Sequence, residues 1–257
     1  MRSINTYICE KLKLNKDSQI PSPQYCPKNK FELHDLLIKL LEERGQDADL
    51  NDIDTQYIDN MSGLFYEIDM PIRNIDISEW DVSNVQNMGS MFATKDKFNC
   101  DLSSWDVSKV RNMYEMFAHC ESFTSNISQW DISNVINTSS MFYGCINFNC
   151  DLSKWDTHNI IASSHMFEEC LIFDADLSRW DMSNNKGMTE MFAGCEKFNH
   201  DLSKWDISNV KSMYKMFSDC KSLDQNFESW KIPEFCTTKQ MFDYCDKMKK
   251  LPSWYKK

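Results

Sequence analysis

Hydrophobic and polar positions along the chain repeat with a period of 25 residues. The pattern is clear in residues 101–120, DLSSWDVSKVRNMYEMFAHC. Its tryptophan recurs at Trp80, Trp105, Trp130, Trp155, Trp180, Trp205, Trp230 and Trp254, and its Met-Phe pair at 91–92, 116–117, 141–142, 166–167, 191–192, 216–217 and 241–242. A fixed period of this length predicts a stacked repeat architecture, because one unit cannot bury its apolar side chains without neighbours.

Two shorter patterns alternate within each unit. The apolar spacing 0, 3, 4, 7 predicts a helix of about two turns. This spacing is shown by Met113, Met116, Phe117 and Cys120. Residues 98–107, FNCDLSSWDV, predict a short strand. Stacked units would place these strands side by side, about 4.8 Å apart, in a parallel sheet. We therefore predict an α/β repeat solenoid with one short strand and one short helix in each unit.

The repeats begin with an imperfect unit. Residues 49–65, DLNDIDTQYIDNMSGLF, align with residues 101–117, and Ile53 takes the place of the tryptophan. We predict a repeat domain over residues 49–257, with about eight units. An open first unit would expose its core and sheet edge, so a cap is expected before it, and we assign this cap to residues 29–48.

The sequence of the cap predicts a helix over residues 29–45, NKFELHDLLIKLLEERG. Asn29 and Glu32 form a capping-box-like pair at its start, and Gly45 suits its end. Its apolar face is predicted to contain Phe31, Leu37, Ile38, Leu40 and Leu41.

Residues 1–28 are predicted to form an N-terminal amphipathic segment and a Pro-containing connector. Residues 1–14 have two interpretations, a small helix packed on the cap or a peptide that docks on another protein.

The segment has no continuous apolar stretch and no small-residue cleavage site, so we expect no secretory signal. Eleven cysteines without a signal peptide are typical of reduced thiols, which predicts a cytoplasmic location.

The repeat resembles a known family. The string F-N-x-D-L-S-x-W-D-(V/I)-S-N-V-x-x-M-x-x-M-F-x-x-C is similar to the BspA-like leucine-rich-repeat family, which includes bacterial surface proteins, mycoplasma lipoproteins and phage proteins. The resemblance covers residues 49–254. It implies a leucine-rich-repeat-like solenoid and a binding role, since characterised relatives are described as surface proteins that bind host matrix or receptors. This chain departs from that group in lacking a signal peptide and a lipobox-like cysteine near its start.

The charge of the chain narrows the classes of partner. The formal net charge is −11, which argues against a nucleic-acid backbone or an anionic membrane as the main partner. No run of about 18 apolar residues occurs, so we predict no membrane insertion.

Cysteine and aspartate recur at fixed places in the repeat, and both could carry chemistry. Cysteine recurs at Cys120, Cys145, Cys170, Cys195, Cys220 and Cys245. We predict buried, reduced thiols there, with disulfides between adjacent units as the alternative. Aspartate recurs at two places in most units, as at Asp101 and Asp106, with asparagine at Asn126 and Asn226, and is predicted to accept backbone N–H groups in Asx-turns. Calcium binding by these columns is the alternative.

No catalytic arrangement is found in the sequence. The five histidines share no repeat phase, and there is no C-x-x-C pair, phosphate loop or H-E-x-x-H motif. We predict a non-enzymatic protein with no cofactor and no metal site.

A binding surface is predicted where the repeats differ from one another. The positions equivalent to Gln86 and Asp96 are mostly charged or polar, but they turn apolar together in two central units. An apolar patch rimmed by charge marks an interaction site. The predicted partner-binding residues are Ile136, Tyr143, Ile146, Ile161, Leu171 and Ile172. The alternative is a repacked unit that buries them.

These observations predict a protein–protein interaction scaffold that binds a protein partner through its solenoid surface. Two alternatives remain open at this point. One is a surface adhesin that binds host proteins, and the other is a phage or virion structural component that docks through residues 1–14.

Overall fold

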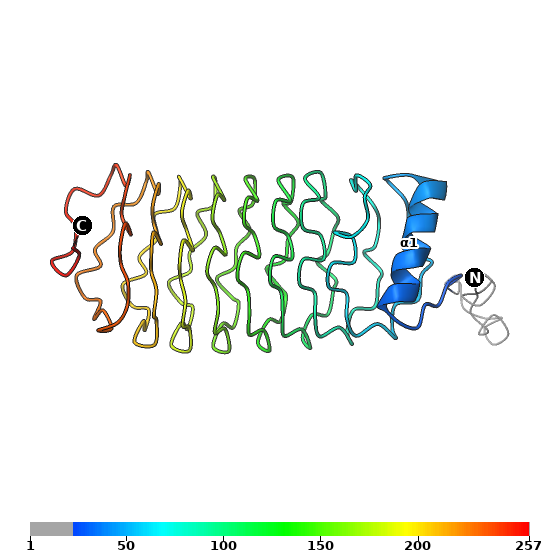
Figure 1. The fold of residues 1–257 in the computed structure, drawn as a ribbon, viewed down its shortest axis with the longest axis horizontal. Helices are drawn as coiled ribbons and strands as arrows, with labels where there is room; N and C mark the ends of the chain where they lie inside the picture. The colour runs from blue at the N-terminus through cyan, green and yellow to red at the C-terminus, as the bar shows by residue number, and fades with distance from the viewer. Residues whose placement is uncertain (1–22, 257) are drawn as a thin grey trace.

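The computed structural model describes residues 23–256. The chain winds into an elongated stack in which each turn lies against the next, with a helix at one end and the C-terminus at the other (Figure 1). Isolated parallel bridges join Asn87 to Asn112, and Asn112 to Asn137. Equivalent residues of consecutive repeats therefore lie side by side, and we call each such set of positions a column. The 25-residue period of the sequence is thus the period of the stack.

The prediction of an α/β solenoid with a parallel sheet is wrong. Within residues 23–256, α1 (Lys30–Arg44) is the only helix and no strand is formed. Pairing between repeats is confined to isolated bridges, and the remaining segments are turns and irregular backbone.

The predicted helix in each repeat is replaced by a series of tight turns. The Met113 N–H donates to the Asn137 carbonyl of the next repeat at 2.9 Å, whereas the Met116 N–H turns back to the Met113 carbonyl at 3.2 Å. This alternation continues to the end of the segment. Glu115 and His119 have φ angles of 53° and 59°, in the left-handed region that single residues adopt but helices do not. Tight turns therefore place the apolar side chains that suggested a helix.

The predicted strand at residues 98–107 is also a pair of turns. The Asp101 Oδ1 atom accepts the Ser103 N–H at 2.9 Å, and the Asp106 Oδ1 atom accepts the Ser108 N–H at 3.0 Å. These bonds confirm the predicted Asx-turns. Hydrogen bonds from the Ser103 backbone and hydroxyl hold the pKa of Asp101 below its usual range, because they favour the charged carboxylate.

The tryptophans join each repeat to an earlier one. In the core, the Trp105 Nε1 atom donates to the Ile77 carbonyl at 3.1 Å, and the Trp130 Nε1 atom donates to the Leu102 carbonyl at 3.0 Å. The contact satisfies the buried indole N–H, and phenylalanine, which has no such donor, could not make it. The same contact recurs from Trp80, Trp155, Trp180, Trp205, Trp230 and Trp254.

The cysteine column is buried beside a stack of phenylalanine rings. The Cys120 Sγ atom donates to the Phe92 carbonyl of the preceding repeat at 3.1 Å, and Cys145 repeats this contact with Phe117 at 3.0 Å. Burial raises the pKa of the Cys120 thiol well above its usual range, so the reactive thiolate is disfavoured. The thiols of this column are free in the structure, as the sequence predicted.

Helix α1 covers the first turns of the stack (Figure 1). The Asn29 Oδ1 atom accepts the Glu32 N–H at 3.0 Å, and the Glu32 carboxylate accepts the Lys28 N–H at 2.9 Å. The helix packs on the core through Leu33, Leu36, Leu37, Leu40 and Leu41. Phe31, predicted on the apolar face, is instead 77% exposed. No helix within the described residues has both the length and the apolar character to cross a membrane.

Replacing Trp155 by phenylalanine should destabilise the stack. The substitution keeps an aromatic ring but removes the donor to the Ile127 carbonyl, which then retains only the Trp130 N–H. We expect the free energy of unfolding to fall by about 1–2 kcal/mol, measured by urea denaturation. Trp254→Phe is the matched control, because Trp254 is half-buried on the last repeat and should lose less. An unchanged free energy for Trp155→Phe would contradict the proposed contribution of the indole contact.

Thiol labelling should distinguish the buried cysteine column from other cysteines. Cys145 and Cys170 are fully buried, whereas Cys150 and Cys236 are half-buried. In the native protein we expect iodoacetamide to modify the latter pair faster by on the order of tenfold, as measured for each peptide by mass spectrometry. The urea-unfolded chain, in which the four should react alike, is the control. Rapid labelling of Cys145 and Cys170 in the native state would contradict the buried column.

Candidate functional site

Four residues of the predicted binding surface are exposed on the central repeats. Ile136 and Ile161 expose 39% and 37% of their surface, and Leu171 and Ile172 expose 38% and 42%. The alternative in which a repacked unit buries them is therefore wrong for these four. Tyr143, like Ile146, is half-buried.

Four of these residues lie in two columns. The Ile136 N–H donates to the Arg111 carbonyl, and the Ile161 N–H donates to the Ile136 carbonyl, both at 2.9 Å. Ile136 and Ile161 are thus direct neighbours along the stack. Ile146 and Leu171 share a second column, ten residues later in each repeat, and the tight turns lie between the two columns in the sequence. We call the six predicted residues together the central patch.

The central repeats also differ in their core. Thr138 and Ser163 stand where the neighbouring repeats have methionine, and both are buried. The Thr138 hydroxyl donates to the Ala162 carbonyl at 3.3 Å, while the Ser163 hydroxyl accepts the Asn185 side-chain amide at 3.0 Å. Because these groups are paired, the substitutions can be accommodated without leaving a buried polar atom unsatisfied.

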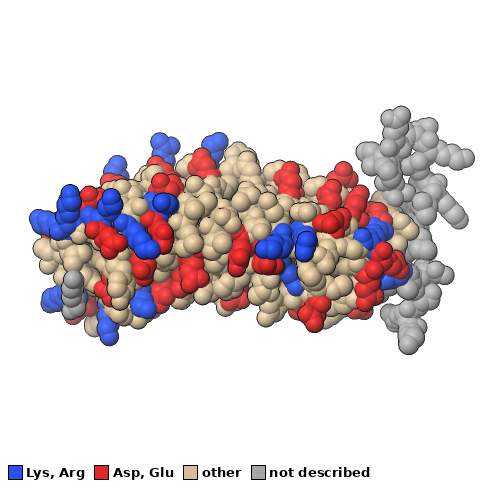
Figure 2. Space-filling view, turned by 90° about the horizontal axis from the view of Figure 1, so that it is seen from above, with Lys and Arg blue, Asp and Glu red and all other residues tan. Residues whose placement is uncertain are grey.

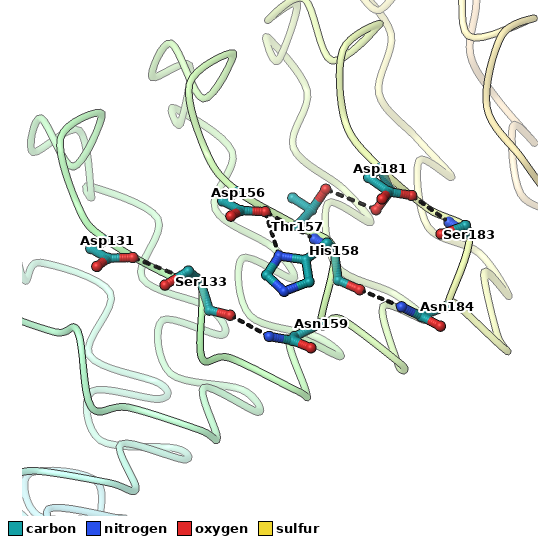
Figure 3. A network of polar contacts seen from close by, with 9 residues as sticks. All are labelled: Asp131, Ser133, Asp156, Thr157, His158, Asn159, Asp181, Ser183 and Asn184. Atoms are coloured by element: carbon teal, nitrogen blue, oxygen red, sulfur yellow. Dashed lines mark hydrogen bonds and ion pairs between the residues drawn. The ribbon is translucent and has the colours of Figure 1, made fainter.

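Asparagine side chains connect the corners of successive repeats (Figure 3). The Asn159 Nδ2 atom donates to the Ser133 carbonyl, and the Asn184 Nδ2 atom donates to the His158 carbonyl, both at 2.7 Å. The serine at this corner itself donates its N–H to Asp131. Each corner therefore combines an Asx-turn within one repeat with an amide contact to the next.

His158 and Thr157 are local variants of this corner (Figure 3). The His158 Nδ1 atom lies 2.7 Å from the Asp156 Oδ1 atom, within the same turn. The buried Thr157 hydroxyl donates to the Asp181 carbonyl at 2.9 Å. These polar groups serve the stacking of the repeats.

A polar cluster beside the central patch escaped the sequence analysis. The His165 Nδ1 atom lies 2.6 Å from the Glu168 Oε2 atom, and Glu190 approaches from the next repeat. One ligand atom of each of the three side chains lies within 4.8 Å of the other two. The hydrogen bond to Glu168 raises the pKa of His165, while burial and the neighbouring Glu168 carboxyl raise the pKa of Glu190.

Tyr143 links the central patch to this cluster. Burial raises the pKa of Tyr143, with smaller contributions from the nearby carboxylates of Glu169, Glu168 and Glu190. Its ring meets the His119 ring edge to face, with 4.5 Å between centroids. Tyr143, a member of the central patch, thus lies near the acidic groups of the cluster.

The cluster could have been found by comparing one more column. His165 and Glu190 occupy equivalent places, where other repeats have serine, glutamate, lysine or glutamine. All members of this column have a positive φ, so the backbone holds them alike while their chemistry varies. Glu168 stands where three other repeats have alanine.

Charge is unevenly distributed over the stack. On the face seen in Figure 2, lysine and arginine side chains are most numerous over the C-terminal repeats, and the surface of the middle repeats is largely uncharged.

The repeats match a known family in two overlapping segments. Residues 37–155 and 136–254 both match the family described as Mycoplasma protein of unknown function, DUF285. The chain belongs to this family. The second DUF285 match contains every residue of the central patch and of the polar cluster. The BspA-like resemblance is not confirmed.

Other comparisons add little to the DUF285 match. No curated protein matches the chain. Among solved structures, a chain in the crystal structure of a TLR13–ssRNA13 complex is similar at 10% sequence identity and a TM-score of 0.25. The similarity covers 86% of this chain and 48% of that chain, so this protein spans about half its length. This weak likeness to a leucine-rich-repeat protein supports no conclusion about function.

The pKa of His165 should depend on its glutamate neighbour. Glu168→Gln removes the charge that favours imidazolium, so we expect the pKa of His165 to fall. The measurement is the pH dependence of the His165 ring resonances by NMR. Glu169→Gln is the matched control, because Glu169 makes no contribution to the elevated pKa of His165. A pKa that is the same in the wild type and in Glu168→Gln would contradict the hydrogen-bonded pair.

Proposed function

We propose that this DUF285 protein is a non-enzymatic interaction scaffold that binds a protein partner through the central patch. The observation that supports this most directly is the exposure of Ile136, Ile161, Leu171 and Ile172 on neighbouring repeats. Other repeats place charged side chains in the columns of Ile136 and Leu171. Apolar side chains gathered where the rest of the surface is charged are typical of an interface.

The stack suits binding because its backbone is held in place before a partner arrives. Repeated hydrogen bonds join Ile136 and Ile161 to their neighbours on both sides. Little conformational freedom is then lost on association, so more of the interaction free energy appears as affinity. Burial of apolar surface contributes about 25 cal/mol for each Å² removed from water.

The charge supports a protein rather than a nucleic acid as the partner. The net charge of −11 would repel a phosphate backbone. The two alternatives, a surface adhesin and a virion component docking through residues 1–14, depend on features beyond the central patch. Residues 1–14 lie outside the described residues.

Two acidic substitutions in the central patch test this function. Ile136→Asp combined with Ile161→Asp places charges where the partner would bury apolar surface. We expect the affinity for the partner to fall by at least about tenfold, with little change in the free energy of unfolding. The partner is first captured from the native source and identified by mass spectrometry. Its affinity for the wild type and for the variant is then measured with the purified partner.

A matched control adds two acids outside the central repeats. Gln86→Asp occupies the same column as Ile136, and Ser222→Asp occupies the column of Ile172. This control variant should retain full affinity and stability. The proposal fails if the double isoleucine variant binds as well as the wild type, or if its fold collapses, which would assign the two isoleucines to the core.

A further inference from the structure

The polar cluster next to the central patch brings together three side chains with metal-binding atoms. His165 and Glu168 belong to one repeat, and Glu190 belongs to the next. One ligand atom from each lies within 4.8 Å of the other two. In the part of the chain that the structure describes, no other group of His, Cys, Asp or Glu side chains meets this criterion.

We propose that His165, Glu168 and Glu190 together bind one divalent transition-metal ion of the Zn²⁺ class. Imidazole and carboxylate are established ligands of Zn²⁺, and three protein ligands with an open fourth position are typical of accessible zinc sites. Mg²⁺ and Ca²⁺ prefer a larger set of oxygen ligands, so we expect them to bind more weakly.

The geometry needs only side-chain adjustment to hold such an ion. Metal–ligand distances of about 2.1 Å in a tetrahedral site place ligand atoms about 3.4 Å apart. The Nδ1 atom of His165 and the Oε2 atom of Glu168 share a hydrogen bond at 2.6 Å, so the ion would displace the proton between them to solvent and the two atoms would move apart by about 0.8 Å. The remaining separations, up to 4.8 Å, can be shortened by rotation about side-chain bonds.

Charge also favours a dication at this place. Two carboxylates face one another across adjacent repeats, and like charges this close repel unless a cation lies between them. Lys215 contributes a positive charge near Glu190 and is itself half-buried, so it offsets only part of the repulsion between the two carboxylates. All three ligand residues are half-buried, which leaves a path for the ion and a place for water.

The aspartate columns offer a contrast within the same fold. The Asp101 and Asp106 carboxylates already accept backbone N–H groups in their own turns. They are occupied by structural hydrogen bonds in every repeat that has them. His165, Glu168 and Glu190 instead depart from the residues found in most equivalent positions, as expected of a site rather than of the scaffold.

Zinc titration of the full chain, treated first with EDTA and kept reduced, tests the site without any partner. Isothermal titration calorimetry should show one Zn²⁺ bound for each chain. Glu190→Gln should weaken binding by at least about tenfold, because a ligand is lost. Glu115→Gln is the matched control, since Glu115 lies in the same column with nearly the same φ, 53° against 52°, and should bind as the wild type does.

Cobalt substitution distinguishes this site from the cysteines. Co²⁺ bound by the cluster should show no thiolate-to-metal charge-transfer band. The proposal is overturned if no ion binds, if that band accounts for the binding, or if His165→Gln, Glu168→Gln and Glu190→Gln all retain wild-type affinity. Circular dichroism checks that each variant is folded. The metal titration does not depend on the central patch, so its failure and the failure of partner binding are separate results.

Discussion

The alternation of backbone hydrogen bonds in the tight turns is the constraint on which the stack depends. Within residues 115–120, N–H groups donate alternately to a carbonyl of the next repeat and to the carbonyl three residues back. Every second residue is thereby tied to a neighbouring repeat, without an extended strand. Left-handed residues such as Glu115 and His119 make this alternation possible. The indole and thiol donors of the core then add a second contact to carbonyls that already accept a backbone N–H.

This backbone separates the residues that must repeat from those that are free to vary. Trp105 and Cys120 face the core and pair with carbonyls of earlier repeats, so their columns tolerate little change. Residues in columns that face water do not have to fill the core or pair with a carbonyl of another repeat. The exposed Ile136 and Ile161, and the cluster around Glu190, both lie in columns of this second kind. A partner and an ion could therefore be accommodated without altering the stack.

The stacking period and the cap could be predicted from the sequence, but the elements within each repeat could not. The helix at Lys30–Arg44 follows from local signals, Asn29 and Gly45, which act over a few residues. The spacing of Met113, Met116, Phe117 and Cys120 is compatible with both a helix and successive turns, and hydrogen bonds to other repeats decide between them. The exposed isoleucines could be found because they break a charged column. The cluster was missed because His165 and Glu190 are far apart in sequence and meet only through stacking.

Because each internal repeat docks only on its neighbours and in the same register, the stack is suited to change its length by whole repeats. Gain or loss of 25 residues would lengthen or shorten the stack and leave every other column intact. Steps of other lengths occur at the two ends: Asn60 pairs with Asn87, 27 residues away, and Trp254, 24 residues after Trp230, still donates to the Phe227 carbonyl. Duplication of complete units is therefore the natural route by which such a gene would grow, with new surface variants arising in the added copies.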